Sequence, residues 1–263
     1  IRKVVIPVAG WGTRSLPASK NVPKEMLPIY NKPAIQYIVE EALHAGLTDV
    51  VLVTNREKRI IEDHFDYNLQ LETVLERANK TEMHCKVRAV AEMASVISIR
   101  QKRQLGLGHA VLCARDIVKD APFGVMLGDD LIFGVEAGIG QLCGAMQRFG
   151  LPCVGVCEVP RDKVSRYGIV DGEEIAPGVL RVRKLVEKPN IEDAPSNLAI
   201  VGRYLLTPDI FSHLDAVRPG KDGEIQLTDA LQNLAASRGL LAVTMSGQRY
   251  DAGDWVEYLT PNI

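Results

Sequence analysis

VVIPVAGWGTRSLPASKNVPKEMLPIYNKP, residues 4–33, is the stretch that decides the fold of this chain. It begins with apolar residues, as a buried strand does, and continues into a loop rich in glycine and cationic residues. Gly10 and Gly12 lack a Cβ atom, so they can adopt positive φ angles and let backbone N–H groups approach an anion. Arg14 can bind a phosphate through two parallel hydrogen bonds, and Lys24 can act as a mobile point charge. A strand that leads into such a loop predicts a polyphosphate site.

Two familiar phosphate-binding loops do not fit this stretch. The dinucleotide fingerprint G-x-G-x-x-G needs glycine at position 15, where the chain has Ser15, so a nicotinamide-dependent dehydrogenase is disfavoured. The P-loop needs G-K-S or G-K-T after its glycines, and no such tripeptide follows. Five prolines between positions 7 and 33 oppose the immediate strand-to-helix transition of both motifs. We therefore expect a long extended loop, and a plain glycine turn with solvated charges is the less favoured interpretation.

The composition is that of an ordinary soluble globular protein. The chain has 263 residues, of which 46% are hydrophobic and 24% charged, and its net charge of −2 argues against a nucleic-acid-binding surface. No apolar run is long enough to span a membrane, and no signal-peptide pattern precedes the first strand. The five cysteines lack C-x-x-C spacing, which favours reduced thiols. We expect a cytoplasmic protein that binds neither nucleic acid nor membrane.

The pattern downstream of the loop predicts helices that alternate with buried strands. Pro33 precedes an amphipathic stripe from Ile35 to Leu43, and residues 49–55 form a continuous apolar run. Strand, loop, helix and strand in this order form a right-handed parallel βαβ unit. Further strands are expected at residues 96–100, 123–127, 154–159, 198–205 and 240–245, and further helices at about 59–92, from the glycine turn at 101–110 to about 117, at 139–146 and at 228–239.

The second half of the chain has a different pattern. Residues 166–170 and 179–188, with an E-E turn between them, predict antiparallel ribbons beside the main sheet. No linker separates two domains, so we predict one α/β domain over 1–263. Its fold class is a Rossmann-like, doubly wound, mixed and mostly parallel sheet with a small antiparallel subdomain. Residues 250–254 are expected to form a loop, and no closing helix is expected after them, as in a chain trimmed at its end.

Polar residues follow several predicted strands at the point where each strand ends. These groups are residues 10–14, residues 101–108, Asp129 with Asp130, and residues 250–254. Ligands of open α/β sheets bind beyond the carboxyl ends of the strands, so the four groups predict one site. Asp129 and Asp130 offer hard oxygen ligands for Mg²⁺, although an Asp pair that caps a turn is a common alternative. Gln101 has an amide whose donor and acceptor match the edge of uracil.

These motifs resemble those of the sugar-1-phosphate nucleotidyltransferases. Residues 10–28, GWGTRSLPASKNVPKEMLP, are similar to the signature loop G-x-G-T-R-x-x-P-x-[x]n-P-K of that family. The P-K-E-M-L-P ending is most similar to that of its bacterial UTP–glucose-1-phosphate uridylyltransferases. The resemblance spans Ile6 to Tyr258, with departures at Trp11 and Ser15, where Leu and Phe are usual. It implies the fold of the nucleotide-diphospho-sugar transferases, and a homodimer or homotetramer.

The resemblance also implies a role for particular residues. It places a nucleotide-binding part at about 1–135, with Ala9, Gly10, Gly12, Thr13, Glu25, Gln101 and Gly106 on the nucleotide. It places a sugar-phosphate-binding part at about 136–263, with Tyr167, Gly168, Glu187, Lys188, Asn197 and Gly202 on the sugar phosphate. Asp129 and Asp251 would hold the metal, although Gly253-Asp254-Trp255 departs from the usual G-S-K or G-D-K continuation. Glu224 and Asp229 match a recurrent family stretch, but helix capping explains them equally well. His109 is interpreted as a helix-start residue with no catalytic role.

The activity that the resemblance implies is uridylyl transfer. UTP and α-D-glucose 1-phosphate would give UDP-glucose and pyrophosphate, by Mg²⁺-assisted in-line attack of the sugar phosphate on the α-phosphate. Arg14, Lys24 and Lys188 would be the catalytic residues. Because the second pKa of a phosphate monoester is about 6, the nucleophile needs no general base at pH 7. Transfer with dTTP, CTP or another sugar phosphate remains an alternative, and so does a catalytically silent homologue that binds a UDP-sugar and regulates a partner.

Overall fold

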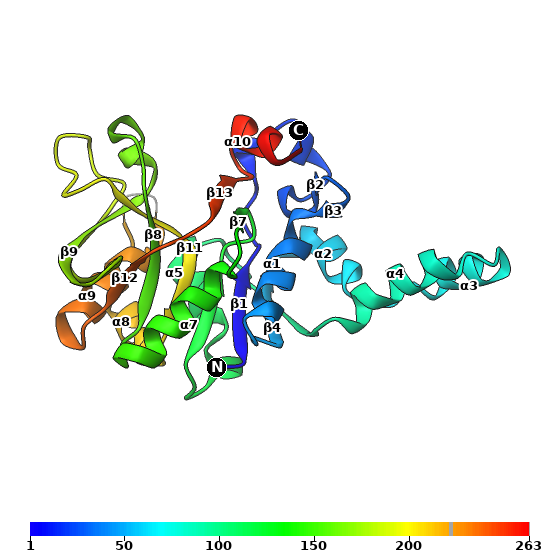
Figure 1. Ribbon diagram of the computed structural model, residues 1–263, viewed down its shortest axis with the longest axis horizontal. Coiled ribbons are helices and arrows are strands. Elements are labelled where there is room, and N and C mark those ends of the chain that lie inside the picture. The colour runs from blue at the N-terminus through cyan, green and yellow to red at the C-terminus, as the bar shows by residue number, and fades with distance from the viewer. Residues whose placement is uncertain (221–222, 263) are drawn as a thin grey trace.

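The chain folds around a nine-stranded mixed sheet, seen in the computed structural model of Figure 1, which describes residues 1–220 and 223–262. The strand order is β5-β4-β1-β6-β11-β8-β12-β10-β9. The bounds are β1 Lys3–Pro7, β4 Asp49–Thr54, β5 Ser95–Arg100, β6 Phe123–Met126, β8 Cys153–Glu158, β9 Gly168–Ala176, β10 Val179–Glu187, β11 Leu198–Leu206 and β12 Leu241–Thr244. Strands β5, β4, β1 and β6 pair in parallel, whereas β11 is antiparallel to both β6 and β8. The predicted mixed α/β sheet is therefore confirmed.

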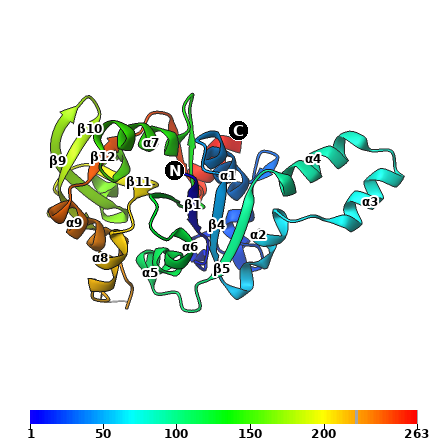
Figure 2. The ribbon, with the colours of Figure 1, turned by 90° about the horizontal axis from the view of Figure 1, so that it is seen from below.

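Helices cover both faces of this sheet, because its central strands alternate apolar side chains between the two sides. On β1, Val4 and Ile6 belong to one buried cluster and Val5 to the other. Figure 2 shows α1 (Ala34–His44) and α7 (Gly138–Phe149) on one face, and α5 (Gly106–Cys113), α8 (Ile210–Ala216) and α9 (Leu227–Ser237) on the other. The short α6 (Arg115–Val118) follows α5 directly. The continuous apolar runs of the sequence thus form strands buried on both faces, as predicted.

The loop after β1 contains no α-helix, as its prolines predict, but it is not extended. It folds into three short 3₁₀ turns at Thr13–Ser15, Ala18–Lys20 and Lys24–Met26. A two-residue ladder between β2 (Pro28–Ile29) and β3 (Lys32–Pro33) then leads into α1. The turns close on local backbone hydrogen bonds, such as that from Ser15 N–H to the Gly12 carbonyl oxygen at 2.9 Å. The loop is therefore compact, and it follows the carboxyl end of β1.

The predicted antiparallel ribbon is present as β9 and β10, which pair over most of their length. It is continuous with the main sheet, because β10 pairs with β12 and β9 also pairs with β11. Residues 250–254, predicted as a loop, are partly a strand: β13 (Gln248–Asp251) pairs with β7 (Asp130–Phe133). Neither β7 nor α8 was predicted, and α10 (Trp255–Leu259) occurs where no closing helix was expected.

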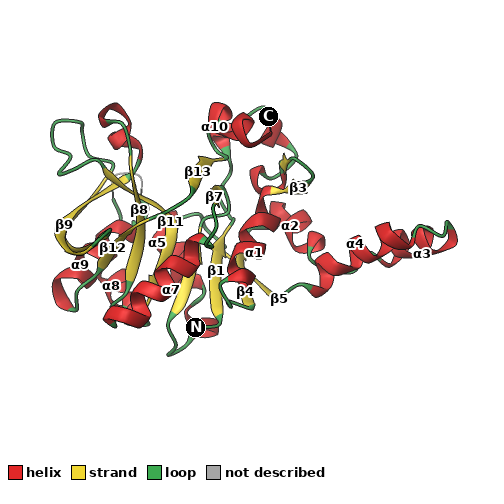
Figure 3. Cartoon of the chain, in the orientation of Figure 1, coloured by secondary structure: helices red, strands yellow, loops and turns green. Residues whose placement is uncertain are grey.

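Two helices project from the body as an arm. After α2 (Arg59–His64), α3 (Leu69–Arg77) and α4 (Thr81–Glu92) extend away from the sheet before the chain returns as β5 (Figures 1 and 3). No residue of α4 is buried, whereas Glu72 and Leu75 of α3 are. Among the described residues, no helix has both the length and the apolar character needed to cross a membrane.

Candidate active site

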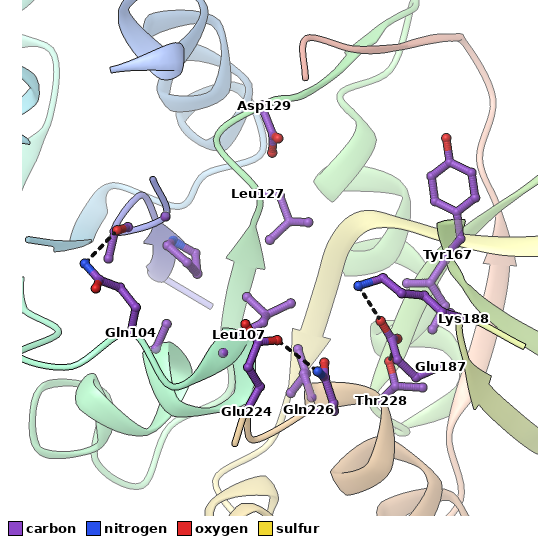
Figure 4. Close-up of a pocket in the computed structure, with 18 of the residues that line it drawn as sticks. Gln104, Leu107, Leu127, Asp129, Tyr167, Glu187, Lys188, Glu224, Gln226 and Thr228 are labelled. Atoms are coloured by element: carbon purple, nitrogen blue, oxygen red, sulfur yellow. Dashed lines mark hydrogen bonds and ion pairs between the residues drawn. The ribbon is translucent and has the colours of Figure 1, made fainter. Parts of the chain in front are cut away.

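A cavity of about 460 Å³ lies beyond the carboxyl ends of β1, β5 and β6. Gly10 follows β1, Gln101 follows β5 and Asp129 follows β6, so three of the four predicted groups meet in its wall. Glu187, the last residue of β10, and Lys188 line it from the other half of the chain. Figure 4 shows Gln104 and Leu107 on one side of this cavity and Tyr167, Lys188 and Glu187 on the opposite side. The cavity therefore offers different polar groups to the two ends of a ligand, Gln101 on one side and Glu187 with Lys188 on the other.

Gln101 forms a buried polar group on the first side of the cavity. Its side chain is 5% exposed, and its amide Nε2 donates to the Gly106 carbonyl oxygen at 3.1 Å. The same Nε2 lies 3.0 Å from Nδ1 of His109, which the sequence analysis left without a role. Burial lowers the pKa of His109, so its imidazole is neutral at pH 7 and Nδ1 can accept this bond. Among the described residues, none donates to Oε1 of Gln101.

Gly106 begins α5 in a conformation that suits glycine. Its φ is +90°, and a Cβ atom at this position would lie 2.9 Å from both the Glu224 Cβ and the Ile225 carbonyl oxygen. The segment before α9 is held against this turn, since Ile225 N–H donates to the Leu105 carbonyl oxygen at 2.7 Å. Glu224 thereby lines the cavity, and its carboxylate accepts a hydrogen bond from Gln226. The second glycine turn thus fixes the position of Glu224 in the wall of the cavity.

Cations of the signature loop face carboxylates at the mouth of the cavity. The Nζ atom of Lys24 lies 2.5 Å from Oδ2 of Asp129. Arg14 lies 3.8 Å from Asp129 and 3.7 Å from Asp251, measured between guanidinium nitrogen and carboxylate oxygen. Burial alone would raise the pKa of Asp129, but Lys24 and Arg14 together hold that pKa below its ordinary value. The fourth predicted group therefore reaches the site through Asp251, although Asp251 does not line the cavity itself.

Asp129 and Asp251 suit a divalent cation. Burial raises the pKa of Asp251, and the nearby Asp129 and Asp130 raise it further, so a cation beside Asp251 would stabilise its carboxylate. Mg²⁺ is usually bound by one or two carboxylates together with substrate phosphates, so two carboxylates are sufficient. Within residues 1–220 and 223–262, no group of three or more metal-ligating side chains was found. The residues present fit a metal that a substrate helps to hold.

Glu25 is a buried residue of the signature loop, and its partner, Lys58, was not predicted. Its carboxylate is 2% exposed and accepts two hydrogen bonds from Nζ of Lys58, at 2.8 and 2.7 Å. Lys58 precedes α2 and is separated from Glu25 by 33 positions, so no local pattern connects them. Because the Lys58 ammonium balances the charge of the Glu25 carboxylate, the pair adds no net negative charge to the wall of the cavity.

The opposite side of the cavity carries the residues predicted for the sugar phosphate. Oε2 of Glu187 accepts from the Thr228 hydroxyl at 2.7 Å, and Nζ of Lys188 lies 3.5 Å from Oε1 of Glu187. Lys188 has a positive φ of 43°, which is strained for a residue other than glycine, while its N–H donates to the Tyr167 carbonyl oxygen at 3.0 Å. Tyr167 and Gly168 complete this wall.

Arg249 connects Asp130 with Tyr167 and was not predicted. Its guanidinium binds both carboxylate oxygens of Asp130, at 2.8 and 2.9 Å, and lies 5.1 Å from the ring centroid of Tyr167. Asp130 also accepts from the Gly202 N–H at 2.9 Å. Asp130 therefore has a structural role, which leaves Asp129 as the carboxylate that faces the cavity.

Several predicted residues do not line the cavity. Gly12 and Thr13 lie in the signature loop outside its wall, and Asn197 accepts a hydrogen bond from Arg161 before β11. Gly202 is buried in β11, and a Cβ there would lie 2.7 Å from the Leu127 side chain. Its absence of a side chain permits strand packing beneath the site. Five of the residues predicted for the nucleotide line the cavity: Ala9, Gly10, Glu25, Gln101 and Gly106.

Comparison with known proteins gives one consistent result. The family described as "Nucleotidyl transferase" matches residues 3–262. The UTP–glucose-1-phosphate uridylyltransferase of Bacillus subtilis (strain 168) is 47% identical over 263 residues, which are 100% of this chain and 90% of the relative. A corresponding enzyme of Staphylococcus saprophyticus is also 47% identical, over 100% of this chain and 92% of its own.

Solved structures agree with these relatives. A crystal structure of UDP-glucose pyrophosphorylase complexed with UDP-glucose has a TM-score of 0.90 and 42% identity, and covers 100% of this chain and 97% of its own. The UTP-bound enzyme from Acinetobacter baumannii has a TM-score of 0.92 and 40% identity, with coverage of 100% and 92%. The chain belongs to the nucleotidyl transferase family and, within it, to the UTP–glucose-1-phosphate uridylyltransferases.

Proposed function

We propose that this protein transfers the uridylyl group of UTP to α-D-glucose 1-phosphate, which gives UDP-glucose and pyrophosphate. The observation that supports this most is the two-sided cavity, with Gln101, Arg14 and Lys24 on one side and Glu187 and Lys188 on the other. The relatives named for this reaction span the whole chain, and one solved neighbour is described as bound to UTP and another to UDP-glucose.

On the nucleotide side, Gln101 would recognise the base. Its Oε1 is an acceptor, and the N3–H group of uracil is a donor. Ala9, Gly10, Gly106 and Glu25 would surround the nucleoside, whereas Gly12 and Thr13 would act through the backbone of the signature loop. Arg14 would stabilise the pyrophosphate as it leaves, because a guanidinium can bind phosphate oxygens by two hydrogen bonds.

On the sugar side, Glu187 would accept hydrogen bonds from the glucose hydroxyls, and Tyr167, Gly168 and Asn197 would complete the pocket. Lys188 would bind and orient the sugar phosphate, which is itself the nucleophile. Its second pKa is about 6, so it is mostly a dianion at pH 7 and attacks without a general base. The protein then has to hold two anions in line and neutralise their charge.

Asp129 and Asp251 would hold Mg²⁺ with the substrate phosphates. The cation would supply charge neutralisation at the phosphates, as metals do in phosphoryl transfer. Lys24 now pairs with Asp129, and it would neutralise charge on the transferred or leaving phosphates once Asp129 turns to the cation.

The test is pyrophosphate release measured across UTP, dTTP, CTP and GTP, each with glucose 1-phosphate and Mg²⁺. We expect release only when UTP, sugar phosphate and metal are all present. Faster release with dTTP than with UTP would contradict the base assignment. If folded protein binds UDP-glucose but releases no pyrophosphate with any pair, the regulatory alternative would replace this proposal.

The protein would act in the cytoplasm as a homodimer or homotetramer. All five of its cysteines are free thiols, which a reducing compartment maintains. Light scattering coupled to gel filtration would measure the mass of the assembly against 28.9 kDa for one chain. A monomer at micromolar concentration would contradict the assembly.

A further inference from the structure

The Gln101 amide is held from two sides by acceptors. Nε2 lies 3.1 Å from the Gly106 carbonyl oxygen and 3.0 Å from Nδ1 of His109. An amide nitrogen has two N–H groups, and two acceptors can use both of them. A carbonyl oxygen can only accept, so the neighbouring atom of Gln101 has to be the nitrogen rather than the oxygen. The two contacts together leave Oε1 as the atom available to a ligand.

We propose that His109 is a positioning residue for base selection, which acts by holding the Gln101 amide with its oxygen toward the cavity. This inference rests on the nucleotide transfer proposed above and names the residue that enforces its base preference. His109 and Gln101 are eight positions apart, on α5 and after β5, so the contact depends on the turn that Gly106 makes between them.

The consequence depends on the hydrogen-bonding edge of the base. Uracil and thymine present an N3–H donor, which Oε1 accepts, whereas cytosine presents an N3 lone pair that would face the lone pairs of Oε1. A buried polar group that faces a group of the same kind loses its hydrogen bond, which costs binding free energy. His109 therefore favours UTP and dTTP over CTP, and has no effect on the choice between UTP and dTTP.

Three variants test the proposal. His109→Leu removes the acceptor, while His109→Asn keeps a side-chain oxygen close to the position of Nδ1. Cys113→Ala is the matched control, because its sulfur lies 4.0 Å from the same Nδ1 without holding the amide. Calorimetry with Mg²⁺ measures the dissociation constants of UTP, dTTP and CTP, and circular dichroism verifies folding. If His109→Leu does not fold, His109→Ala replaces it.

We expect His109→Leu to lower the preference for UTP over CTP by about tenfold, the value of one hydrogen bond. Affinities for UTP and dTTP should fall together, and His109→Asn and Cys113→Ala should keep the wild-type preference. An unchanged preference in His109→Leu would overturn the proposal, and so would an equal loss in His109→Asn or a wild-type protein that binds CTP as tightly as UTP. Absence of pyrophosphate release in the wild type would count against the proposed function alone, because the binding preference is measured without turnover.

Discussion

Lys188 has a positive φ of 43°, a conformation that residues other than glycine rarely adopt. The side chain of Lys188 is 58% exposed and lines the cavity beside Glu187. Strain of this kind persists only where the surroundings impose it, and it occurs often at functional sites. We predict that Lys188→Ala lowers kcat/KM for glucose 1-phosphate by about 10- to 100-fold, the value of a hydrogen bond to a charged group.

Steady-state kinetics with varied glucose 1-phosphate measures this effect. Calorimetry measures the dissociation constant of UTP, which is proposed to bind at the other side of the cavity. The UTP dissociation constant should not change, because Lys188 lies on the sugar side. Lys184→Ala is the control, since Lys184 is exposed on β10, the strand that precedes Lys188, and does not line the cavity. Near-normal turnover in Lys188→Ala would remove this lysine from the mechanism.

The buried pair of Glu25 and Lys58 should control stability as well as binding. Glu25→Gln leaves the Lys58 ammonium buried without its partner, and removal of one member of a buried ion pair typically costs about 3–5 kcal/mol. We predict a loss of that order in the free energy of unfolding in urea. The double variant Glu25→Gln/Lys58→Met should recover part of it, because no charge then remains buried.

The exposed pair of Glu82 and Lys86 on α4 is the control for this experiment. Glu82→Gln should leave the urea midpoint unchanged, because surface ion pairs contribute little. If Glu25→Gln were as stable as the wild type, Lys58 would have to find water or another acceptor in the folded protein.

Sequence patterns identify a functional residue when the motif that reveals it lies among its neighbours in the chain. Arg14, Lys24 and Asp129 were predicted because each belongs to a short motif at a strand end. Lys58 and Arg249 were missed because their partners, Glu25 and Asp130, lie 33 and 119 positions away. His109 was assigned to a helix start, which is correct, but its contact with Gln101 depends on the turn between them.

At the scale of elements, the start of α5 depends on one glycine. A residue that replaced Gly106 would have to adopt a positive φ, and its Cβ would overlap the Glu224 side chain and the Ile225 backbone. We predict that Gly106→Ala lowers the free energy of unfolding by about 1–3 kcal/mol and weakens UTP binding, because the turn that holds Gln101 has to shift. Thermal unfolding and calorimetry measure the two effects.

Gly144 in α7 provides a control, because replacing it with alanine should raise the free energy of unfolding instead of lowering it. A Cβ there would have no atom within 4 Å, and glycine within a helix costs about 0.5–1 kcal/mol relative to alanine. Gly144→Ala should therefore stabilise the protein and leave UTP binding unchanged. A Gly106→Ala variant that matched Gly144→Ala in stability would contradict the steric argument.

Elements with a strong periodic pattern were predicted closely. The apolar runs gave β4, β8 and β11, and the stripe from Ile35 to Leu43 gave α1. Strands β7 and β13 were missed because each has only four residues and pairs with a segment more than a hundred positions away. Their pairing places Asp251 opposite Asp130, so this part of the site needs tertiary structure to be seen.

At the scale of the whole molecule, one sheet joins the half of the chain that carries Gln101 and Asp129 to the half that carries Glu187 and Lys188. Strand β11 pairs with β6 of the first half and β8 of the second. We predict a single cooperative unfolding transition, observed at the same urea concentration by circular dichroism and by fluorescence. UDP-glucose at 100 times its dissociation constant should raise the free energy of unfolding by about 2.7 kcal/mol in that one transition. Two separate transitions, with only one shifted by the ligand, would show that the halves unfold independently.

The paired charges at the mouth of the cavity bear on how fast a nucleotide arrives. Lys24 and Arg14 face Asp129, and Lys58 faces Glu25, so opposite charges lie within a few ångströms of each other. Seen from beyond a screening length of about 8 Å, such pairs produce little electric field, and the chain as a whole is slightly negative. A triphosphate would reach the site by ordinary diffusion, with an association rate that changes little with salt. Selectivity among nucleotides would then be expressed after contact, in how long each one stays.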